Sequence, residues 1–152
     1  MATSKIPQGF NTITPTLVLS GAADALTLYQ NAFGAKEEYR MMCPDGSGKV
    51  MHACLVIGNS KLFVTDVNPQ MGCANPSASG FYLYVDDVDS AAAKAKKAGL
   101  TEKSPVQDMF WGDRTGSFTD KFGIMWTLAT HVRDVSDNDM KEAMKNMSNK
   151  AA

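Results

Sequence analysis

The fold of this chain is decided by residues 111–131, WGDRTGSFTDKFGIMWTLATH. Residues 114–119 are mostly polar, and their glycine and phenylalanine are two residues apart, so both lie on the same face of a strand. Residues 124–130 are rich in β-branched and aromatic side chains. Both patterns are typical of β-strands. Between them Gly123 is free to adopt a positive φ, which a tight reversal needs. The stretch therefore predicts a β-hairpin.

The loop that leads into this hairpin carries Phe110, Trp111 and Arg114. A connecting loop rarely buries two large rings, so Phe110 and Trp111 are candidates for stacking on a ligand. The guanidinium of Arg114 could set the charge and orientation of that ligand. The alternative is that the cluster only locks a turn through cation–π and ion-pair contacts.

The rest of the chain repeats one order of elements, with helices that end at Gly34 and Gly99. In the first half, strands are expected at residues 13–19, 37–43, 50–57 and 61–67, with a helix at residues 22–33. In the second half, a strand at residues 80–85, a helix at residues 91–98 and a strand at residues 101–107 precede the hairpin. Each half therefore reads βαβββ, which is an internal repeat.

We predict one domain over residues 1–135, built of modules 10–67 and 79–131 with a linker at 68–78, followed by a helical tail at 136–152. The fold class is α+β. The two βαβββ modules are expected to form a curved eight-stranded mixed sheet with the helices on its convex side. A pocket on the concave side, between the modules, is the default ligand site.

Composition excludes several classes of partner. The 152 residues have 44% hydrophobic content and a net charge of −1, so nothing in the charge favours nucleic acid. No apolar run approaches the roughly 20 residues that cross a bilayer, and residues 1–7 lack the apolar middle of a signal peptide. A cytoplasmic protein is expected. Cys43, Cys54 and Cys73 are odd in number and widely spaced, which predicts free thiols.

Three blocks of sequence, residues 28–34, 52–66 and 111–131, resemble the vicinal oxygen chelate superfamily, which contains glyoxalase I, extradiol dioxygenases and bleomycin resistance proteins. Within that superfamily the likeness is to the PhnB-like group. The chain departs from that group's usual last turn, because Lys121 and Ile124 stand where the group has proline and histidine.

The resemblance also implies where a metal would sit. Metal-dependent members place His, Gln or Glu on the first and last strands of each half, and these positions fall here on Thr14, Leu62, Gly80 and Thr127. Glycine and leucine have no donor atom, and neutral threonine hydroxyls seldom hold a transition metal unaided. We therefore predict that the metal site is absent and that no cofactor is bound.

Two histidines are available for chemistry. If the turn at residues 58–60 has three residues, His52 shares a face with Leu62 and Asp66 and points into the concave side. A His52–Asp66 pair could then act as an acid or base. If the turn has two residues, His52 points at the helices. His131 lies where the last strand ends, and it is expected to anchor the tail.

Strand alternation assigns further ligand-binding candidates to the concave face. Tyr82 and Tyr84 follow Gly80 on its parity and could wall the pocket, with core filling as the alternative. Asp66 and Arg114 also have the parity of that face. Trp126 has the opposite phase and is expected to pack on the helices.

The leading hypothesis is a metal-independent small-molecule-binding protein, present as a homodimer, that resembles PhnB-like and bleomycin-resistance-type proteins. The first alternative is a metal-dependent lyase or isomerase of the glyoxalase type. The second is a structural dimer whose cavity is filled by side chains. No residue is assigned a catalytic role, and the sequence leaves open whether turnover occurs.

Overall fold

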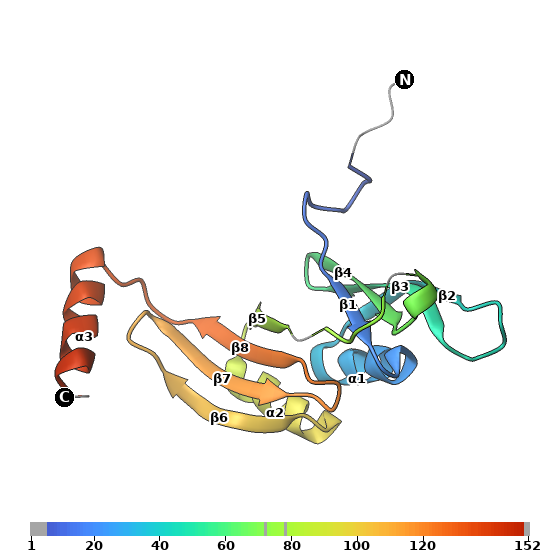
Figure 1. Cartoon of the computed structure of the whole chain (residues 1–152). Helices are drawn as coiled ribbons and strands as arrows, with labels where there is room; N and C mark the ends of the chain where they lie inside the picture. The colour runs from blue at the N-terminus through green and yellow to red at the C-terminus, as the bar shows by residue number, and fades with distance from the viewer. Residues whose placement is uncertain (1–5, 72, 78, 151–152) are drawn as a thin grey trace.

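The computed structural model describes residues 6–71, 73–77 and 79–150. The elements follow in the order β1 (Thr16–Leu19), α1 (Ala22–Phe33), β2 (Lys36–Met42), β3 (Val50–Ile57), β4 (Ser60–Asp66), the short 3₁₀ helix η1 (Pro69–Met71), β5 (Gly80–Tyr84), α2 (Val88–Ala98), β6 (Thr101–Asp108), β7 (Asp113–Thr119), β8 (Met125–His131) and α3 (Asp137–Lys150) (Figure 1). Each half therefore has the predicted βαβββ order.

The eight strands form two four-stranded mixed sheets. Their orders are β1-β4-β3-β2 and β5-β8-β7-β6, so the two halves share one topology. In each sheet the first pair is parallel and the other pairs are antiparallel. The predicted α+β fold class is confirmed. The strands are divided between two sheets, however, because in the described part of the chain no strand pairing joins the halves.

Local sequence signals set the ends of the helices. Gly34 and Gly99 both adopt a left-handed conformation at the C-terminal ends of α1 and α2, as predicted. α2 begins at Val88, three residues before the predicted start. The reason is Asp87, whose side chain accepts hydrogen bonds from the first free N–H groups of the helix.

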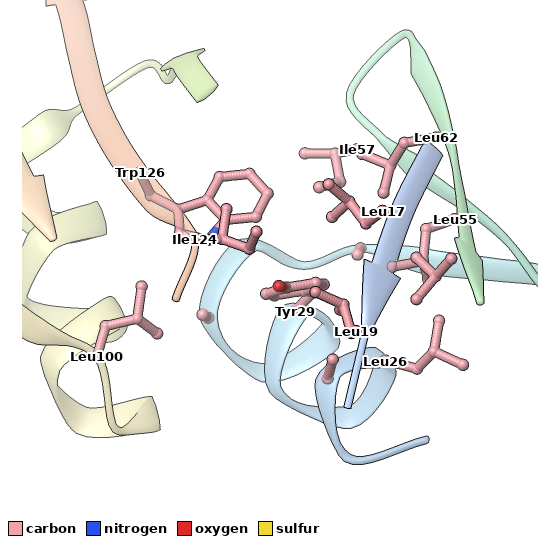
Figure 2. Packing of buried hydrophobic residues seen from close by; sticks show 14 of the residues in the cluster. Leu17, Leu19, Leu26, Tyr29, Leu55, Ile57, Leu62, Leu100, Ile124 and Trp126 are labelled. Carbon is pink, nitrogen blue, oxygen red and sulfur yellow. The ribbon is translucent and has the colours of Figure 1, made fainter. Parts of the chain in front are cut away.

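The hydrophobic core lies where α1 and α2 pack against each other. Figure 2 shows Tyr29 of α1 between Leu19 of the first sheet and Trp126 of the second. The rings of Tyr29 and Trp126 are 5.1 Å apart, and both are buried. The prediction that Trp126 packs on the helix side is confirmed. The helix-facing sides of the two sheets therefore share one core.

This packing leaves the other side of each sheet uncovered by helices, and we call these sides the open faces. Large side chains are exposed on both open faces, among them Tyr39 and Met41 on the first and Tyr82, Tyr84 and Met125 on the second. Since α1 and α2 pack together at the junction of the halves (Figure 1), the two open faces do not enclose a common trough within one chain. The predicted concave side of one eight-stranded sheet is therefore not formed, although two hollows are lined by residues of both halves.

One buried carboxylate ties the two halves together. Asp120, in the turn between β7 and β8, accepts hydrogen bonds from the Tyr29 hydroxyl at 2.8 Å and from the Trp126 indole N–H at 3.1 Å. It also accepts the backbone N–H groups of Phe122 and Ile124. Burial, and then the charge of Asp120, raise the pKa of Tyr29. Asp120 thus fixes the hairpin turn and the position of α1 at once.

The C-terminal helix α3 stands apart from both sheets (Figure 1). Within the described residues it contacts no other helix or strand. None of the helices in the described part of the chain is both long and apolar enough to span a membrane.

Candidate functional site

Strand β4 directs the side chains differently from the prediction. Ile57 pairs with Ser60, so the turn between β3 and β4 contains two residues, and Leu55 pairs with Leu62. Leu55 and Leu62 both lie in the core beside the helices. The assignment of Leu62 to the concave face was therefore wrong, and the neighbouring Phe63 occupies the open face instead.

His52 lies on the open face of the first sheet, although the turn has two residues. Its Nε2 atom is 3.0 Å from the Tyr39 hydroxyl, and its ring centroid is 4.5 Å from that of Phe63. The prediction that a two-residue turn would point His52 at the helices was wrong. It assumed that Leu62 and Asp66 lie on the concave face, whereas both lie on the helix side. His52 is thus accessible to a ligand, but with different neighbours.

Asp66 lies on the helix side of the first sheet and forms no pair with His52. One carboxylate oxygen accepts the N–H groups of Gly21 and Ala22 at 2.9 and 3.0 Å, and the other accepts the Val50 N–H at 2.7 Å. Gly21, the residue before α1, has no side chain that could cap the helix. Asp66, which lies on β4, caps the helix instead. The interpretation of Asp66 as a concave-face residue was therefore wrong.

Arg114 also points away from the open face. Its guanidinium donates to both carboxylate oxygens of Asp89 on α2, at 2.8 and 2.9 Å, and to Asp108 at 3.1 Å. The hydrogen bonds to Asp89, followed by those to Asp108, raise the pKa of Arg114. The structure therefore places Arg114 in a surface ion-pair network against the helix, contrary to the predicted parity.

The open face of the second sheet carries a polar cluster centred on Asp113, which is only 3% exposed. One oxygen of Asp113 accepts the Tyr82 and Tyr84 hydroxyls at 2.8 and 3.0 Å. The other lies 2.8 Å from His131 Nδ1. Burial alone would raise the pKa of Asp113, but the hydrogen bonds from the imidazole and the two phenols outweigh it and hold the pKa below its ordinary value.

His131 bridges two carboxylates. Nδ1 bonds Asp113, and Nε2 lies 3.0 Å from Asp134, a side chain that is fully exposed. A carboxylate only accepts hydrogen bonds, so the two ring nitrogens can donate to both carboxylates at once only when the imidazole is protonated. The hydrogen bonds to Asp134 and Asp113 raise the pKa of His131. The cluster thus stabilises positive charge.

The loop between β6 and β7 brings aromatic rings to this cluster. Gly112 has a φ of 100°, and a Cβ atom there would collide with the backbone carbonyl of Arg133. The turn orients Trp111, whose indole N–H lies 3.5 Å from the Tyr82 hydroxyl. The Phe110 ring packs edge-on against Trp111 at 5.0 Å. Of the predicted residues, the structure therefore brings Trp111 and Phe110 together with Tyr82 and Tyr84.

A hollow lies beside this cluster along the edge strand β5. It has a volume of about 490 Å³ and is bordered by both tyrosines, by Asp86 and by Asn59 of the β3–β4 turn. A second hollow of about 290 Å³ lies next to Tyr82 and Trp126 and reaches Ile13 and Lys61. These volumes are in the range of small-molecule sites.

Sequence reasoning missed Asp113 and His131 as the centre of the cluster. A signal was present, because counting outward from the turn at Gly123 pairs Asp113 with His131 across the β7–β8 ladder. Directly paired residues of a ladder share a face, so an acid and an imidazole opposite each other predict a contact. The sequence alone did not show that β5 pairs with β8, which brings the two phenols to the same face as Asp113 and His131.

The residues at the four expected metal positions do not suit a transition metal. Leu62 is buried in the core, Gly80 has no side chain, and Thr127 lies 3.5 Å from the Ser117 hydroxyl. In the described part of the chain, no three His, Cys, Asp or Glu side chains are grouped so that they could hold an ion. The donor set present therefore does not fit a glyoxalase-type metal, and metal independence stays a prediction.

The imidazole of His131 is expected to titrate above 6.5, its ordinary pKa, when followed by NMR. Because the folded-state pKa is the higher one, the stabilisation from the protonated ring is complete below the unfolded pKa and is lost as pH rises through the folded pKa. Asp113→Asn should lower the midpoint, and Asp45→Asn in the distant β2–β3 turn should leave it unchanged. A His131 midpoint at or below 6.5 would contradict the bridged geometry.

Comparisons with known proteins agree with this architecture. An uncharacterized protein of Mycobacterium bovis is 37% identical over 141 residues, which cover 87% of this chain and 91% of that protein. A Bacillus cereus PhnB protein, described as a putative 3-demethylubiquinone-9 3-methyltransferase, has the same fold, with a TM-score of 0.62 at 18% identity over 79% of this chain and 99% of its own.

A third similar structure is TnmS3 of Streptomyces, described as an antibiotic binding protein. It shares the fold with a TM-score of 0.60 at 21% identity, over 86% of this chain and 98% of its own. The family model of the glyoxalase/bleomycin resistance protein/dioxygenase superfamily matches residues 10–128. The repeated βαβββ halves and this match together show that the chain belongs to that superfamily.

Proposed function

We propose that this protein binds a small ring-containing organic molecule without a metal, on the open face of the second sheet beside β5. The observation that carries the proposal is the cluster in which buried Asp113 holds Tyr82, Tyr84 and His131 next to the rings of Trp111 and Phe110. Rings with fixed positions and a few oriented polar groups are what a small-molecule site requires.

The exposure of the two tyrosine rings supports a ligand site rather than a purely structural cluster. Tyr82 and Tyr84 are 46% and 62% exposed, and their rings are 5.2 Å apart. Exposed aromatic groups that are held in place lose little further freedom when a flat molecule stacks on them. The antibiotic-binding Streptomyces neighbour fits such a role, and we extend it to this chain as a proposal.

We also propose that the working form is a homodimer. The two open faces of one chain cannot cover each other, because the packed helices lie at the junction of the halves. In a twofold dimer, the first sheet of one copy can face the second sheet of the other, and the same contact then forms twice. His52 and Tyr39 of one copy would then border the site that contains Asp113 of the other.

The experiment is a thermal-shift screen of ring-containing compounds in the presence of EDTA, with the molecular mass measured by sedimentation. We expect about 2.7 kcal/mol of added stability for a ligand at 100 times its Kd. The mass should be twice the 16.4 kDa of one chain. Asp113→Asn should weaken binding about tenfold or more, because the amide keeps one acceptor oxygen but loses the charge and turns an NH₂ group toward either the two phenols or His131.

Asp45→Asn is the matched control, because it makes the same chemical change in an exposed turn of the other half and should leave binding unchanged. Loss of binding in EDTA, with recovery on addition of zinc, nickel, iron or manganese, would favour the glyoxalase-type enzyme. A protein that binds none of the compounds would support the structural dimer.

We expect a reducing, cytoplasmic setting, since Cys43 and Cys54 are buried thiols without a disulfide.

A further inference from the structure

The tyrosines on the second open face have unusually electron-rich surroundings. Each phenol hydroxyl donates a hydrogen bond to the same oxygen of Asp113. A phenol that donates to a carboxylate has more electron density on its ring, and the face of an electron-rich ring attracts cations. The hydrogen bond to Asp113 also raises the pKa of the Tyr84 hydroxyl.

The charges around the rings have one predominant sign. Asp113 and Asp134 bond His131, and Asp86 borders the hollow beside Tyr84. The nearest arginines are used elsewhere. Arg114 pairs with Asp89 on the helix side, and Arg133 donates to the Phe110 carbonyl. Among the groups bonded to this cluster, His131 therefore supplies the positive charge, and Lys61, which borders the hollow next to Tyr82, is paired with Glu38 at 2.7 Å.

From this juxtaposition we infer that the open face of the second sheet binds the cationic group of an organic ligand, an amine or a quaternary ammonium, over the rings of Tyr82 and Tyr84. The inference rests on the proposed function and adds the charge class of its ligand. The two ring centroids are 5.2 Å apart, so one cation can lie within about 6 Å of both. The carboxylates behind them supply the complementary charge.

The same geometry makes the bound cation compete with a proton. The groups that face His131 are Asp113 on β7 and Asp134 after β8, and Tyr82 and Tyr84 on β5 reach it through Asp113. When His131 loses its proton, the charge of the cluster changes from −1 to −2, counting Asp113, Asp134 and the imidazole. Affinity for a cation should therefore rise as pH increases through the His131 titration.

The test compares choline with 3,3-dimethylbutan-1-ol, which has nearly the same shape and no charge. Binding is measured by NMR titration of the whole chain at one pH above and one pH below the His131 midpoint, which is located first by NMR. At the higher pH, we expect choline to bind at least about fivefold more tightly than the neutral alcohol. At the lower pH, choline should bind less tightly than it does at the higher pH.

Variants separate the rings from the general charge of the protein. Tyr84→Leu should weaken choline at least about fivefold, and Tyr84→Phe, which keeps the ring, should weaken it less. Asp45→Asn should have no effect. The comparison of the two probes in the unmodified protein needs no variant, so the inference remains testable if Tyr84→Leu does not fold.

Equal affinity for the two probes, or choline binding that is unchanged in Tyr84→Leu, would overturn the inference. If neutral ring compounds bind and choline is not preferred, only the charge class is wrong and the proposed function stands. If neither class binds, both fail. If Tyr84→Leu lowers the mass from dimer to monomer and choline does not bind, the rings hold a side chain of the second copy instead.

Discussion

Asp120→Ala is expected to lower the free energy of unfolding by about 4 kcal/mol, the largest effect of any single change considered for this protein. The carboxylate accepts four hydrogen bonds, two from the side chains of Tyr29 and Trp126 and two from the backbone of its own turn. Alanine would leave two buried side-chain donors without an acceptor, each at a cost of about 1–3 kcal/mol. Urea unfolding followed by tryptophan fluorescence measures the loss.

Two controls separate the buried network from a general loss of charge. Tyr29→Phe removes one of the four hydrogen bonds and should cost about 1–2 kcal/mol. Asp45→Ala removes an exposed turn carboxylate that accepts one backbone N–H, from Ser47, and should cost less than about 1 kcal/mol. If Asp120→Ala cost no more than Asp45→Ala, Asp120 would not join the halves as described.

Asp66→Ala is expected to cost about 3 kcal/mol of stability and to leave ligand affinity of the folded protein unchanged. Its carboxylate caps α1 through Gly21 and Ala22 and holds the start of β3 through the Val50 N–H. Removing it leaves three backbone donors unsatisfied at the edge of the core, and it removes a negative charge from the N-terminal end of a helix. Urea unfolding and a binding titration, made on the same variant, measure the two quantities.

Asp24→Ala is the matched control, because Asp24 lies in the first turn of the same helix with its side chain 75% exposed. It should cost less than about 1 kcal/mol. Asp66→Asn should fall between the two, since its amide keeps one acceptor oxygen but turns an NH₂ group toward an N–H donor. A loss of ligand affinity without a loss of stability would return Asp66 to the ligand site.

The elements of secondary structure followed from local signals. The strand β3 and the helix α1 have the predicted bounds, and the hairpin reverses at Gly123 with a φ of 88°. These features depend on the period of apolar side chains and on backbone freedom at glycine, which act over a few residues. The start of α2 moved to Val88 because Asp87 caps the helix, and β1 begins at Thr16, three residues after the predicted start.

The candidate site was predicted only in part. Tyr82 and Tyr84 lie on an open face as alternation required, and Trp111 joins them through its loop. Arg114 and Asp66 were assigned to the wrong face. Strand alternation fixes which residues share a face, but the choice between helix side and open side depends on what packs there. Arg114 faces the helix because Asp89 is within reach of its guanidinium.

The sequence by itself determined the repeated βαβββ order and the α+β class, because these depend on residue type and short-range pattern. The tertiary structure decided that the eight strands form two sheets around a shared helical core. It also decided that Asp113 of β7 meets two phenols from β5 and an imidazole from β8. These contacts join residues that are 18 to 31 positions apart, so they depend on how the elements pack. The side-chain pattern of one strand does not show which face of the neighbouring strand it will meet.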